Sequence, residues 1–400
     1  MAQGSSERNI SVVIKSEDQI RALRAAHSAF YLSYLTMGIG LVGPGVVGSV
    51  LVKQILEQRE DLKREFGVDI QVHGILTSKK MLLSDSPHGL DLETWRAKFD
   101  ACIVPGDVKK FAEHLKKQAP HVVICDCTSS QDIANEYETW LSQGISVTTP
   151  NKKANSGSYE KYKAIRRAQK TGNHSHFFYE ANVGAGLPVI STIRDLSRTG
   201  DKFIEIQGIF SGTLSFIFNE FDGSVPFSTI VKQAKDAGYT EPDPRDDLSG
   251  TDVARKVVIL AREIGLQVEL GDIPVKSLVP KELEKVSVDE FMRRLPEFDK
   301  ELADMASVAA KKGEKLRYVG VINAVDKKCS VELMQYPATH PFGALKGSDN
   351  IVLFRTVRYN KQPLTVRGPG AGAEVTAGGI FADILRVASY YGGRSAAEDL

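Results

Sequence analysis

Cysteine is scarce in this chain of 400 residues, which contains only four, namely Cys102, Cys125, Cys127 and Cys329. Four thiols are too few for a disulfide framework, and their scarcity indicates a reducing compartment. An excess of charge of one sign is also lacking, because 51 Lys and Arg residues balance 50 Asp and Glu residues. We therefore predict no nucleic-acid partner and no anionic membrane as a partner.

The sequence also lacks an uninterrupted apolar run that could cross a membrane. Residues 26–52 contain no Lys, Arg, Asp or Glu and are long enough to span a bilayer. However, this stretch includes Pro44 and several glycines, which would break a single helix. We predict instead a helix end, a buried strand, a glycine turn and the start of a new helix. The first residues, MAQGSSERN, lack the apolar core of a signal peptide, and no transit peptide is visible.

The alternation of apolar and amphipathic segments predicts two kinds of sheet. From Gly38 onward, strands within GIGLVG, IQVHGILTS, HVVICDCTSS and ISVTTPNKKA alternate with helices, one of them over ANEYETWLSQG. This alternation is typical of a doubly wound parallel sheet. After about residue 180, the strand-like segments IEIQGIF, RYVGVINAV, SVELMQY and NIVLFRTVRY indicate a second, mixed sheet of α+β type. The predicted fold class is α/β, with a Rossmann-type parallel sheet plus a mixed α+β domain.

A short strand at residues 10–14 and a helix after it precede this alternation. Ser16 can cap the helix. The apolar residues of the helix fall at helical spacing, at Ile20, Leu23, Ala26 and Phe30. Because one strand and one helix cannot form a domain, this segment either docks onto the parallel-sheet domain or ends a different domain.

A glycine-rich loop comes directly after the first strong strand. Gly43-Pro44-Gly45-Val46-Val47-Gly48 fits the pattern G-x-G-x-x-G between an apolar strand and a helix. Glycines at these places permit a tight turn and close backbone approach to a pyrophosphate, and the helix N-terminus supplies N–H donors. The pattern alone is a weak signal, but in this strand–loop–helix context it predicts dinucleotide binding.

The end of the second strand bears on the choice of cofactor. NAD-selective sites usually place an acidic residue here, where it binds the ribose hydroxyls. This chain has Ser78, Lys79 and Lys80 instead. Two lysines suit a 2′-phosphate, so we predict that NADP(H) is preferred and that NAD(H) is possible. The alternative is that both lysines are solvated residues of a turn.

The stretch EPDPRDDLSGTDVARK, residues 241–256, is unusually rich in charge. Ser249 or Thr251 can cap a helix on which Asp252 and Lys256 are spaced i, i+4. One interpretation is a surface ion pair that contributes a few tenths of a kcal/mol.

The residues before this helix favour another interpretation. Glu241, Asp243, Asp246 and Asp247 form an acidic run that Pro242 and Pro244 make rigid. Rigid carboxylates around one lysine would suit a substrate that carries an ammonium group and needs a proton donor. The residues alone leave both interpretations open.

Several segments together resemble the homoserine dehydrogenase family. They are YTEPDPRDDLSGTDVARK, VGPGVVGS, VTTPNKKANSG, YEANVGAGLPVISTIRDL, GIFSGTLSFIFNEF, HPFGALKGSDN and RGPGAGAEVTAGGIFADIL. They occur in the family's order from about residue 37 to 392, and the wording is most similar to the dehydrogenase half of the plant bifunctional aspartate kinase–homoserine dehydrogenases. The resemblance implies NAD(P)H-dependent interconversion of L-aspartate 4-semialdehyde and L-homoserine, within threonine, methionine and isoleucine biosynthesis.

The resemblance also implies a division of the chain. Residues 1–36 resemble the end of an ACT-like regulatory region, and residues 37–180 form the dinucleotide-binding domain, which residues 368–392 complete. Residues 181–317 are expected to form the substrate domain, and residues 318–367 the strands through which relatives build a homodimer.

Roles for the charged residues come from the resemblance in the same way. Lys256 is the expected acid/base, and Lys152 is expected between the nicotinamide and the substrate. Substrate contacts are expected from Glu241, Asp252, Asp247 and Asp246. Cofactor contacts are expected from Gly43, Gly45, Val46, Val47, Gly48, Ser78, Lys79, Lys80, Thr128, Ser129, Lys152, Gly370 and Gly372.

The segment YEANVGAGLPVI resembles a monovalent-cation loop of the family. Glu180 would provide a side-chain oxygen, and Val183, Ala185 and Leu187 would provide backbone carbonyls. Oxygen ligands of low total charge suit Na⁺ better than a transition metal. Asn182 stands where the family usually has threonine, which bears on the detailed geometry of the loop.

The compartment and the regulation are also expectations from the resemblance. A product of a plant-like fusion would lie in the plastid, and any other product in the cytoplasm. Because only the tail of a regulatory region is visible, inhibition by threonine is expected to be weak or absent.

Two other functions compete with this interpretation. One is another NADP oxidoreductase acting on a small amino-acid aldehyde; an enzyme that forms an acyl phosphate would need a nucleophilic cysteine, and Cys125 and Cys127 lie in an apolar strand. The other is a regulatory protein that binds the cofactor without catalysis. The presence of Lys152, Lys256, Glu241 and Asp252 argues against it.

Overall fold

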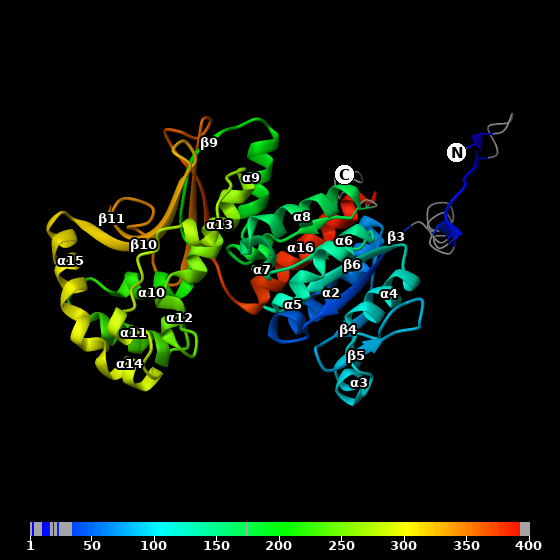
Figure 1. Ribbon diagram of the computed structural model, residues 1–400, viewed down its shortest axis with the longest axis horizontal. Helices are drawn as coiled ribbons and strands as arrows, with labels where there is room; N and C mark the ends of the chain where they lie inside the picture. The colour runs from blue at the N-terminus through cyan, green and yellow to red at the C-terminus, as the bar shows by residue number, and fades with distance from the viewer. Residues whose placement is uncertain are drawn as a thin grey trace.

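The computed structural model describes residues 2–3, 10–16, 19, 22–23, 34–172 and 175–392. Figure 1 shows two bodies side by side, joined near α13 and α7. At the N-terminus, β1 (Ala2–Gln3) pairs with β2 (Ile10–Ser11) in antiparallel fashion. The strand predicted at residues 10–14 is therefore shorter than expected, and most of the helix predicted after it lies outside the described residues.

The first body contains the six-stranded sheet that the sequence predicts. Its strand order is β5-β4-β3-β6-β7-β8, and every pairing is parallel except that of β4 with β5. The strands are β3 (Leu35–Val42), β4 (Val68–Leu76), β5 (Met81–Leu83), β6 (His121–Asp126), β7 (Ser146–Thr148) and β8 (Phe177–Phe178). The prediction of a doubly wound parallel sheet is confirmed.

Helices cover both faces of this sheet, so its strands are apolar on both sides. They are α2 (Val46–Phe66), α3 (Trp95–Ala101), α4 (Val108–Gln118), α5 (Gln131–Asn135), α6 (Tyr137–Ser142), α7 (Lys153–Ser156) and α8 (Tyr159–Thr171). Along β6, Val123 and Cys125 face the core shared with α2, whereas Val122 and Ile124 face the core shared with α4 and α6. The single helix predicted over residues 134–144 is thus divided between α5 and α6.

The last helix among the described residues returns to the first body. α16 (Ala373–Tyr390) lies against α2, as the red helix beside the blue one in Figure 1 shows. Ala377, Ile380 and Ile384 of α16 belong to the same buried core as Leu51 and Ile55 of α2. Segments far apart in the sequence therefore build the first body together.

The second body is built on a five-stranded sheet with the order β11-β10-β9-β12-β13. The strands are β9 (Phe203–Ile209), β10 (Glu314–Asn323), β11 (Lys328–Pro337), β12 (Asp349–Thr356) and β13 (Leu364–Pro369). All its pairings are antiparallel. The predicted combination of strands and helices is confirmed, but the sheet itself is antiparallel rather than mixed, because its strands are joined without parallel crossovers.

Helices of the second body pack on one face of this sheet and beyond it. They are α9 (Val189–Arg198), α10 (Gly212–Glu220), α11 (Phe227–Asp236), α12 (Pro244–Leu248), α13 (Thr251–Glu263), α14 (Val288–Arg294) and α15 (Asp299–Lys311). Short 3₁₀ turns are η2 (Glu180–Asn182), η3 (Leu270–Asp272), η4 (Lys281–Leu283) and η5 (Leu295–Phe298). No helix among the described residues combines the length and apolarity needed to span a bilayer.

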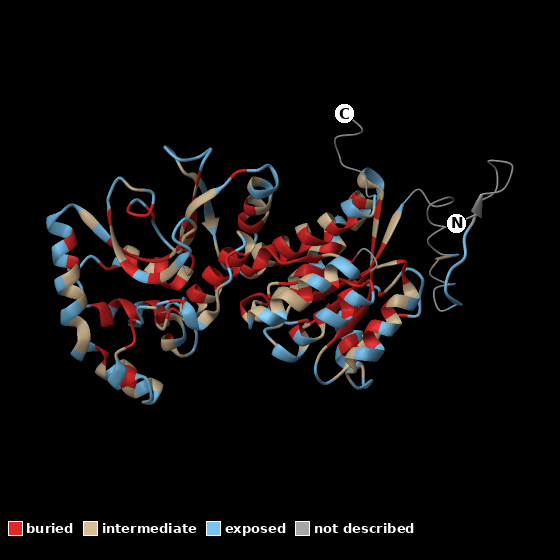
Figure 2. Ribbon diagram, turned by 45° about the horizontal axis from the view of Figure 1, so that its top comes forward, coloured by how far each residue is buried: buried red, intermediate tan, exposed pale blue. Residues whose placement is uncertain are grey.

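Helix α13 lies at the junction of the two bodies and is buried along most of its length (Figures 1 and 2). At its C-terminal end, the buried carboxylate of Glu263 pairs with Arg166 of α8 at 3.2 Å and with Arg194 of α9 at 3.0 Å. Because removing one partner from a buried pair is strongly destabilising, these contacts hold α13 in place against the first body.

Candidate active site

Three charged side chains meet where the two bodies join. Lys152 comes shortly after β7 of the first body, and its Nζ lies 2.7 Å from Oδ1 of Asp252 on α13. The other carboxylate oxygen of Asp252 lies 2.8 Å from Nζ of Lys256, one helical turn along. One carboxylate therefore bridges two ammonium groups from different halves of the protein.

The electrostatics of the three groups are coupled. Burial alone would raise the pKa of Asp252, but the charges of Lys256 and Lys152 outweigh it and hold this pKa well below its usual range. Burial and the charge of Lys256 lower the pKa of Lys152, whereas Asp252 opposes that shift. Asp252 thus stays ionised between the two lysine side chains.

The ammonium group of Lys256 has a second acceptor. Its Nζ donates to the carbonyl oxygen of Phe210 at 2.6 Å, and Nδ2 of Asn350 donates to the same carbonyl at 3.1 Å. Lys256 is 8% exposed, so these contacts fix its direction in a largely dry setting. Sequence reasoning found no signal for Asn350.

The start of α13 differs from the prediction. Neither Ser249 nor Thr251 caps the helix; Gly250 is the N-cap residue, with φ of 71°, a left-handed conformation that favours glycine. A Cβ at Gly250 would also lie 2.1 Å from the hydroxyl oxygen of Tyr318. The tight turn brings Asp252 into the first turn of α13, near the positive end of its dipole.

The acidic run before α13 is only partly gathered around the lysines. Oδ2 of Asp247 accepts a hydrogen bond from the backbone N–H of Glu241 at 2.8 Å, and burial raises the pKa of Asp247. Asp243 caps α12 and pairs with Arg245 at 2.6 Å, which makes it structural. The carboxylates of Glu241 and Asp246 are exposed and form no ion pair with a described residue.

The glycine loop has the geometry that a dinucleotide needs. Gly43 has φ of 85°, and a Cβ at Gly48 would lie 2.3 Å from the carbonyl oxygen of Gly43, so this turn requires glycine at both positions. A Cβ at Gly45 would meet nothing within 4 Å, because Gly45 faces open space at the N-terminus of α2. Uncapped N–H groups beside open space can hold a pyrophosphate.

The other residues expected to contact the cofactor fit that role to different degrees. Thr128 lies against Gly43, because a Cβ added at Gly43 would be 2.6 Å from the methyl group of Thr128. Ser129, Ser78 and Lys79 are exposed. Lys80 departs from the expectation, because its Nζ donates to the carbonyl oxygen of Asp100 at 2.9 Å and lies over the ring of Phe99.

An arginine that sequence reasoning missed contacts the glycine loop instead. Arg96 of α3 donates to the carbonyl oxygen of Pro44 at 3.1 Å and to the hydroxyl of Ser49, and its guanidinium lies 4.1 Å from the ring centre of Trp95. No motif spacing links Arg96 to the loop, which lies about 50 residues earlier in the chain, so only the fold reveals the contact.

A buried acid surrounded by neutral donors supports the loop that carries Lys152. Asp126, at the end of β6, is 0% exposed. Its oxygens accept hydrogen bonds from the hydroxyl of Tyr137 at 2.5 Å, from Nδ2 of Asn151 at 2.9 Å and from the N–H of Thr128 at 2.8 Å. These contacts tie the ends of β6 and β7 together beside Lys152.

The segment expected to bind a cation is only partly arranged for it. The carboxylate of Glu180 is occupied by donors, namely the N–H groups of Ile190 and Ser191 and the guanidinium of Arg386 at 3.0 Å. The expected side-chain oxygen ligand is therefore directed at α9 rather than at the loop. Gly184 and Ala185 both have positive φ, which makes this turn strained. The turn packs closely on α16, because a Cβ added at Gly379 would lie 2.8 Å from the carbonyl oxygen of Ala185.

The C-terminal glycines return to the site from the second sheet. A Cβ at Gly370 would lie 1.9 Å from Nδ2 of Asn350, so the backbone passes directly over that side chain. Gly372 is the N-cap residue of α16, with φ of 121°. This crossing connects β13 to the helix that completes the first body.

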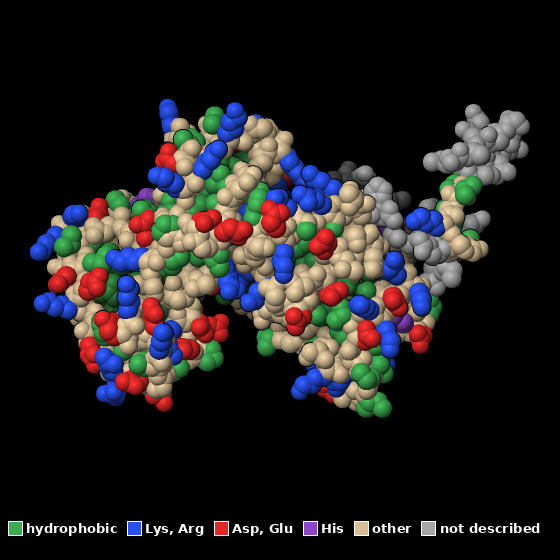
Figure 3. Space-filling model, viewed as in Figure 1, with side chains coloured by type: hydrophobic (Ala, Val, Ile, Leu, Met, Phe, Trp, Pro, Cys, Tyr) green, Lys and Arg blue, Asp and Glu red, His purple; other side chains and the backbone are tan. Residues whose placement is uncertain are grey.

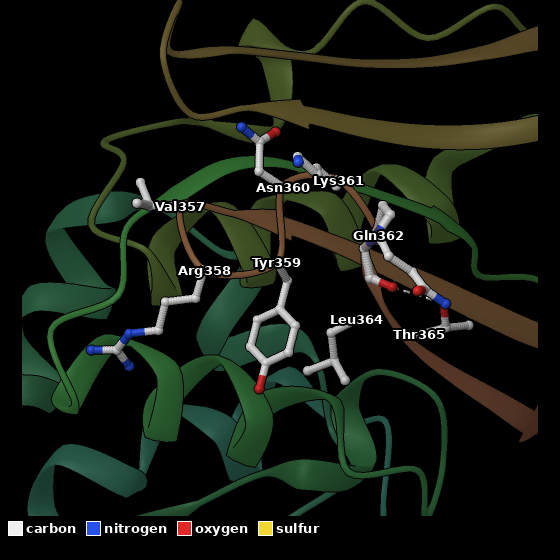
Figure 4. A pocket seen from close by; sticks show the side chains of 9 residues that line it. Val357, Arg358, Tyr359, Asn360, Lys361, Gln362, Leu364 and Thr365 are labelled. Atoms are coloured by element: carbon white, nitrogen blue, oxygen red, sulfur yellow. Dashed lines mark hydrogen bonds between the residues drawn. The ribbon is translucent and has the colours of Figure 1, made fainter.

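Two hollows of the molecule differ in the residues that line them. Figure 3 shows a notch between the two bodies with Lys and Arg side chains at its inner end. A separate cavity of about 850 Å³ lies in the connection between β12 and β13, lined by residues 357–365 (Figure 4). None of the residues expected at the active site lines that cavity.

A dinucleotide-binding sheet, a glycine loop open to a pyrophosphate, and paired lysines where a second domain joins define an NAD(P)-dependent oxidoreductase. The family models agree with this class. Residues 43–180 match the NAD-binding domain of homoserine dehydrogenase, residues 188–385 match homoserine dehydrogenase, and residues 1–30 match an ACT domain. The chain belongs to the homoserine dehydrogenase family.

Known proteins similar to this chain support the same assignment. It is 55% identical over 398 residues to the bifunctional aspartokinase/homoserine dehydrogenase 1, chloroplastic, of Zea mays, covering 99% of this chain but 43% of that protein. It is 42% identical to the homoserine dehydrogenase of Schizosaccharomyces pombe, covering 89% of this chain and 96% of that one. A crystal structure of a protein of unknown function from Candida auris matches with a TM-score of 0.82 at 38% identity, covering 88% of this chain and 98% of that one.

Proposed function

We propose that this chain catalyses the reversible, NAD(P)H-dependent reduction of L-aspartate 4-semialdehyde to L-homoserine. The observation that carries the proposal is the Asp252 carboxylate, which lies within 2.8 Å of both Lys152 and Lys256 and so joins the cofactor half to the substrate half. Two neighbouring proton-bearing groups support the protonation of the carbonyl oxygen of a small aldehyde bound beside them.

The residues of the chain have distinct tasks in this reaction. A dinucleotide held at the glycine loop by its pyrophosphate would supply, from its reduced nicotinamide, the hydride that the C4 carbonyl carbon accepts. Lys256 donates a proton to the oxygen on which negative charge develops, and in the reverse direction it removes that proton. Lys152 stabilises the same oxygen through its charge.

The acidic residues would bind the amino group of the substrate. Asp252 is 46% exposed, so part of its carboxylate can accept a further hydrogen bond from an ammonium group. Glu241 adds a second carboxylate, Asp247 orients it through the N–H of Glu241, and Asp246 is an accessory at the rim. Charge-assisted hydrogen bonds of this kind are about twice as strong as neutral ones.

We further propose that NADP(H) is preferred over NAD(H). The end of β4 provides no acid for the ribose hydroxyls. Arg96 supplies positive charge at the glycine loop, and Lys79 is exposed in the turn after β4. Lys80 donates to the backbone carbonyl of Asp100, so we assign the 2′-phosphate to Lys79 and to the donors of Arg96 that the glycine loop does not use.

A monovalent cation, a homodimer and a plastid location complete the proposal. The carbonyls of Val183, Ala185 and Leu187 lie on the strained loop between the two bodies and would hold Na⁺ through oxygen alone.

The β13 edge of the five-stranded sheet has no strand beside it among the described residues, so a second copy could pair with it. The chloroplastic Zea mays relative supports the plastid.

Turnover with identified product tests the proposal. The wild-type protein is expected to oxidise NADPH only when aspartate 4-semialdehyde is present and to form L-homoserine in equal amount. NADH is expected to support the reaction with a higher KM. Cofactor binding without any turnover would instead indicate a regulatory protein, and turnover with other amino-acid aldehydes at equal kcat/KM would indicate a broader reductase.

A further inference from the structure

The accessible side of α13 is a narrow stripe. Residues 253, 254 and 256–262 of this helix are buried. Thr251 is exposed, and Asp252 and Arg255 are partly exposed. Since residues three or four apart share one face of a helix, Arg255 lies on the same side as Asp252, which faces Lys152 across the junction.

Arg255 has no partner among the described residues, since no hydrogen bond, ion pair or aromatic contact involves its guanidinium there. Other arginines near the junction are satisfied. Arg245 pairs with Asp243 at 2.6 Å, and Arg262, on the same helix, pairs with Glu269 at 3.2 Å. The guanidinium of Arg255 is partly exposed and its five donors are unused, so it is available to a ligand that enters the junction.

The charge of Arg255 acts on Lys152. It contributes, after burial and Lys256, to the lowered pKa of Lys152. The two lysines already share the Asp252 carboxylate, so Arg255 is the cation of this stripe that a bound anion can neutralise.

The substrate of the proposed reaction supplies such an anion. Both aspartate 4-semialdehyde and homoserine carry an α-ammonium and an α-carboxylate group. Asp252, Glu241 and Asp247 can serve the ammonium, but none of them can bind a carboxylate. A planar guanidinium matches a carboxylate with two parallel hydrogen bonds, which a lysine cannot reproduce.

We propose that Arg255 binds the α-carboxylate of the amino-acid substrate and thereby selects α-amino acids over simple amino alcohols. The inference rests on the proposed function, because it names the group that recognises one end of that substrate. A diphosphate from the cofactor is the other anion that could occupy the same guanidinium, and the experiment distinguishes the two.

The test compares two alcohols in the oxidation direction with NADP⁺. L-homoserine and 3-aminopropan-1-ol differ only in the carboxylate. In Arg255→Gln, kcat/KM for homoserine is expected to fall about 30- to 100-fold, the scale of a lost charge-assisted pair, whereas kcat/KM for the amino alcohol stays within about twofold. Arg255→Lys is expected to recover only part of the loss. Arg293→Gln, which alters an exposed arginine of α14, is the matched control.

Three results would overturn the proposal. An equal loss for both alcohols would show that Arg255 acts on the reacting groups and not on the carboxylate. A raised Kd for NADP⁺ with unchanged discrimination would assign the guanidinium to the diphosphate. An unaltered ratio of the two kcat/KM values would remove Arg255 from recognition altogether.

Calorimetry separates this inference from the proposed function. If the wild type lacks turnover, the function fails, but binding of homoserine and of the amino alcohol to the NADP⁺-loaded protein still tests the carboxylate site. Arg255 is supported if the wild type binds homoserine at least about 30-fold more tightly and Arg255→Gln abolishes the difference. Equal binding of both alcohols by the wild type overturns it.

Discussion

Replacing Asp252 by Asn probes the bridge that joins the two halves of the active site. The change keeps the shape of the side chain but removes the charge that lies 2.7 Å from Lys152 and 2.8 Å from Lys256. A hydrogen bond to a charged group contributes about 1.5–3 kcal/mol, and the partial exposure of Asp252 favours the lower value. Two such bonds give about 3 kcal/mol, which corresponds to a fall in kcat/KM of about 100-fold.

The pH dependence of the Asp252→Asn variant has a definite sign. In the wild type, burial and the charge of Lys256 lower the pKa of Lys152, and Asp252 opposes them. Without the carboxylate this pKa falls further, so the protonated form of Lys152 is lost at lower pH. The alkaline limb of the kcat/KM profile for aldehyde reduction is therefore expected to move to lower pH.

NADPH oxidation measured from pH 6 to pH 10 provides the assay. Asp304→Asn, which alters an exposed carboxylate on α15, controls for the loss of one negative charge. An alkaline limb that stays in place, together with kcat/KM within threefold of the wild type, would refute the role of the bridge.

Three further predictions concern the scaffold. Asp126→Asn is expected to lower kcat about tenfold and Tm by a few degrees. An amide cannot accept all three hydrogen bonds that Tyr137, Asn151 and the Thr128 N–H donate to the carboxylate. Stopped-flow kinetics and thermal melts check this. Gly48→Ala is expected to lower both Tm and NADPH affinity, whereas Gly45→Ala, whose Cβ meets open space, should lower only the affinity, as calorimetry and melts would show. Burial raises the pKa of Asp383 to about 6, so the folded protein holds this proton more tightly than the unfolded chain and the free energy of unfolding falls as pH rises from 4 to 6. The expected fall is about 2–3 kcal/mol. Denaturant titration should show a smaller fall in the Asp383→Asn variant. A steeper decline in that variant would contradict the assignment.

The parts of the fold that could be predicted are those with strong local signals. The strand before Gly43 and the helix that begins at Val46 are indicated by an apolar run, a glycine pattern and a helical stripe that lie next to each other in the sequence. Lys152 and Asp252 were expected at the site from the family resemblance, and the structure brings their side chains to 2.7 Å of each other. The spacing of Asp252 and Lys256 on one helix also predicted their contact, which the structure confirms at 2.8 Å.

The parts that could not be predicted depend on contacts between distant segments. Lys80 is next to Lys79 in sequence, yet it turns toward Asp100, whose carbonyl is available only because α3 ends there. Arg96 reaches the glycine loop because α3 folds back over it, and no pattern in the chain anticipates this. Glu180 was expected to bind a cation, but the N-terminus of α9 and Arg386 provide donors that only the folded chain brings together.

The sheet of the second body shows the same limit. Its strand-like segments were recognised from composition, but the pairing of β9 with both β10 and β12 depends on strands more than 100 residues apart in the sequence. Apolar periodicity marks a strand without identifying its neighbour, so the antiparallel order had to come from the structure.

Comparing the Lys256→Ala and Lys153→Ala variants in NADPH oxidation with aspartate 4-semialdehyde tests the central claim most directly. Lys153 has the same side chain and lies next to Lys152, but it belongs to α7 and makes no ion pair with Asp252. The account predicts that Lys256→Ala binds NADPH normally and loses kcat by about 100-fold or more, whereas Lys153→Ala stays close to the wild type. Equal and mild effects of both substitutions would contradict it, because the proton would then come from elsewhere.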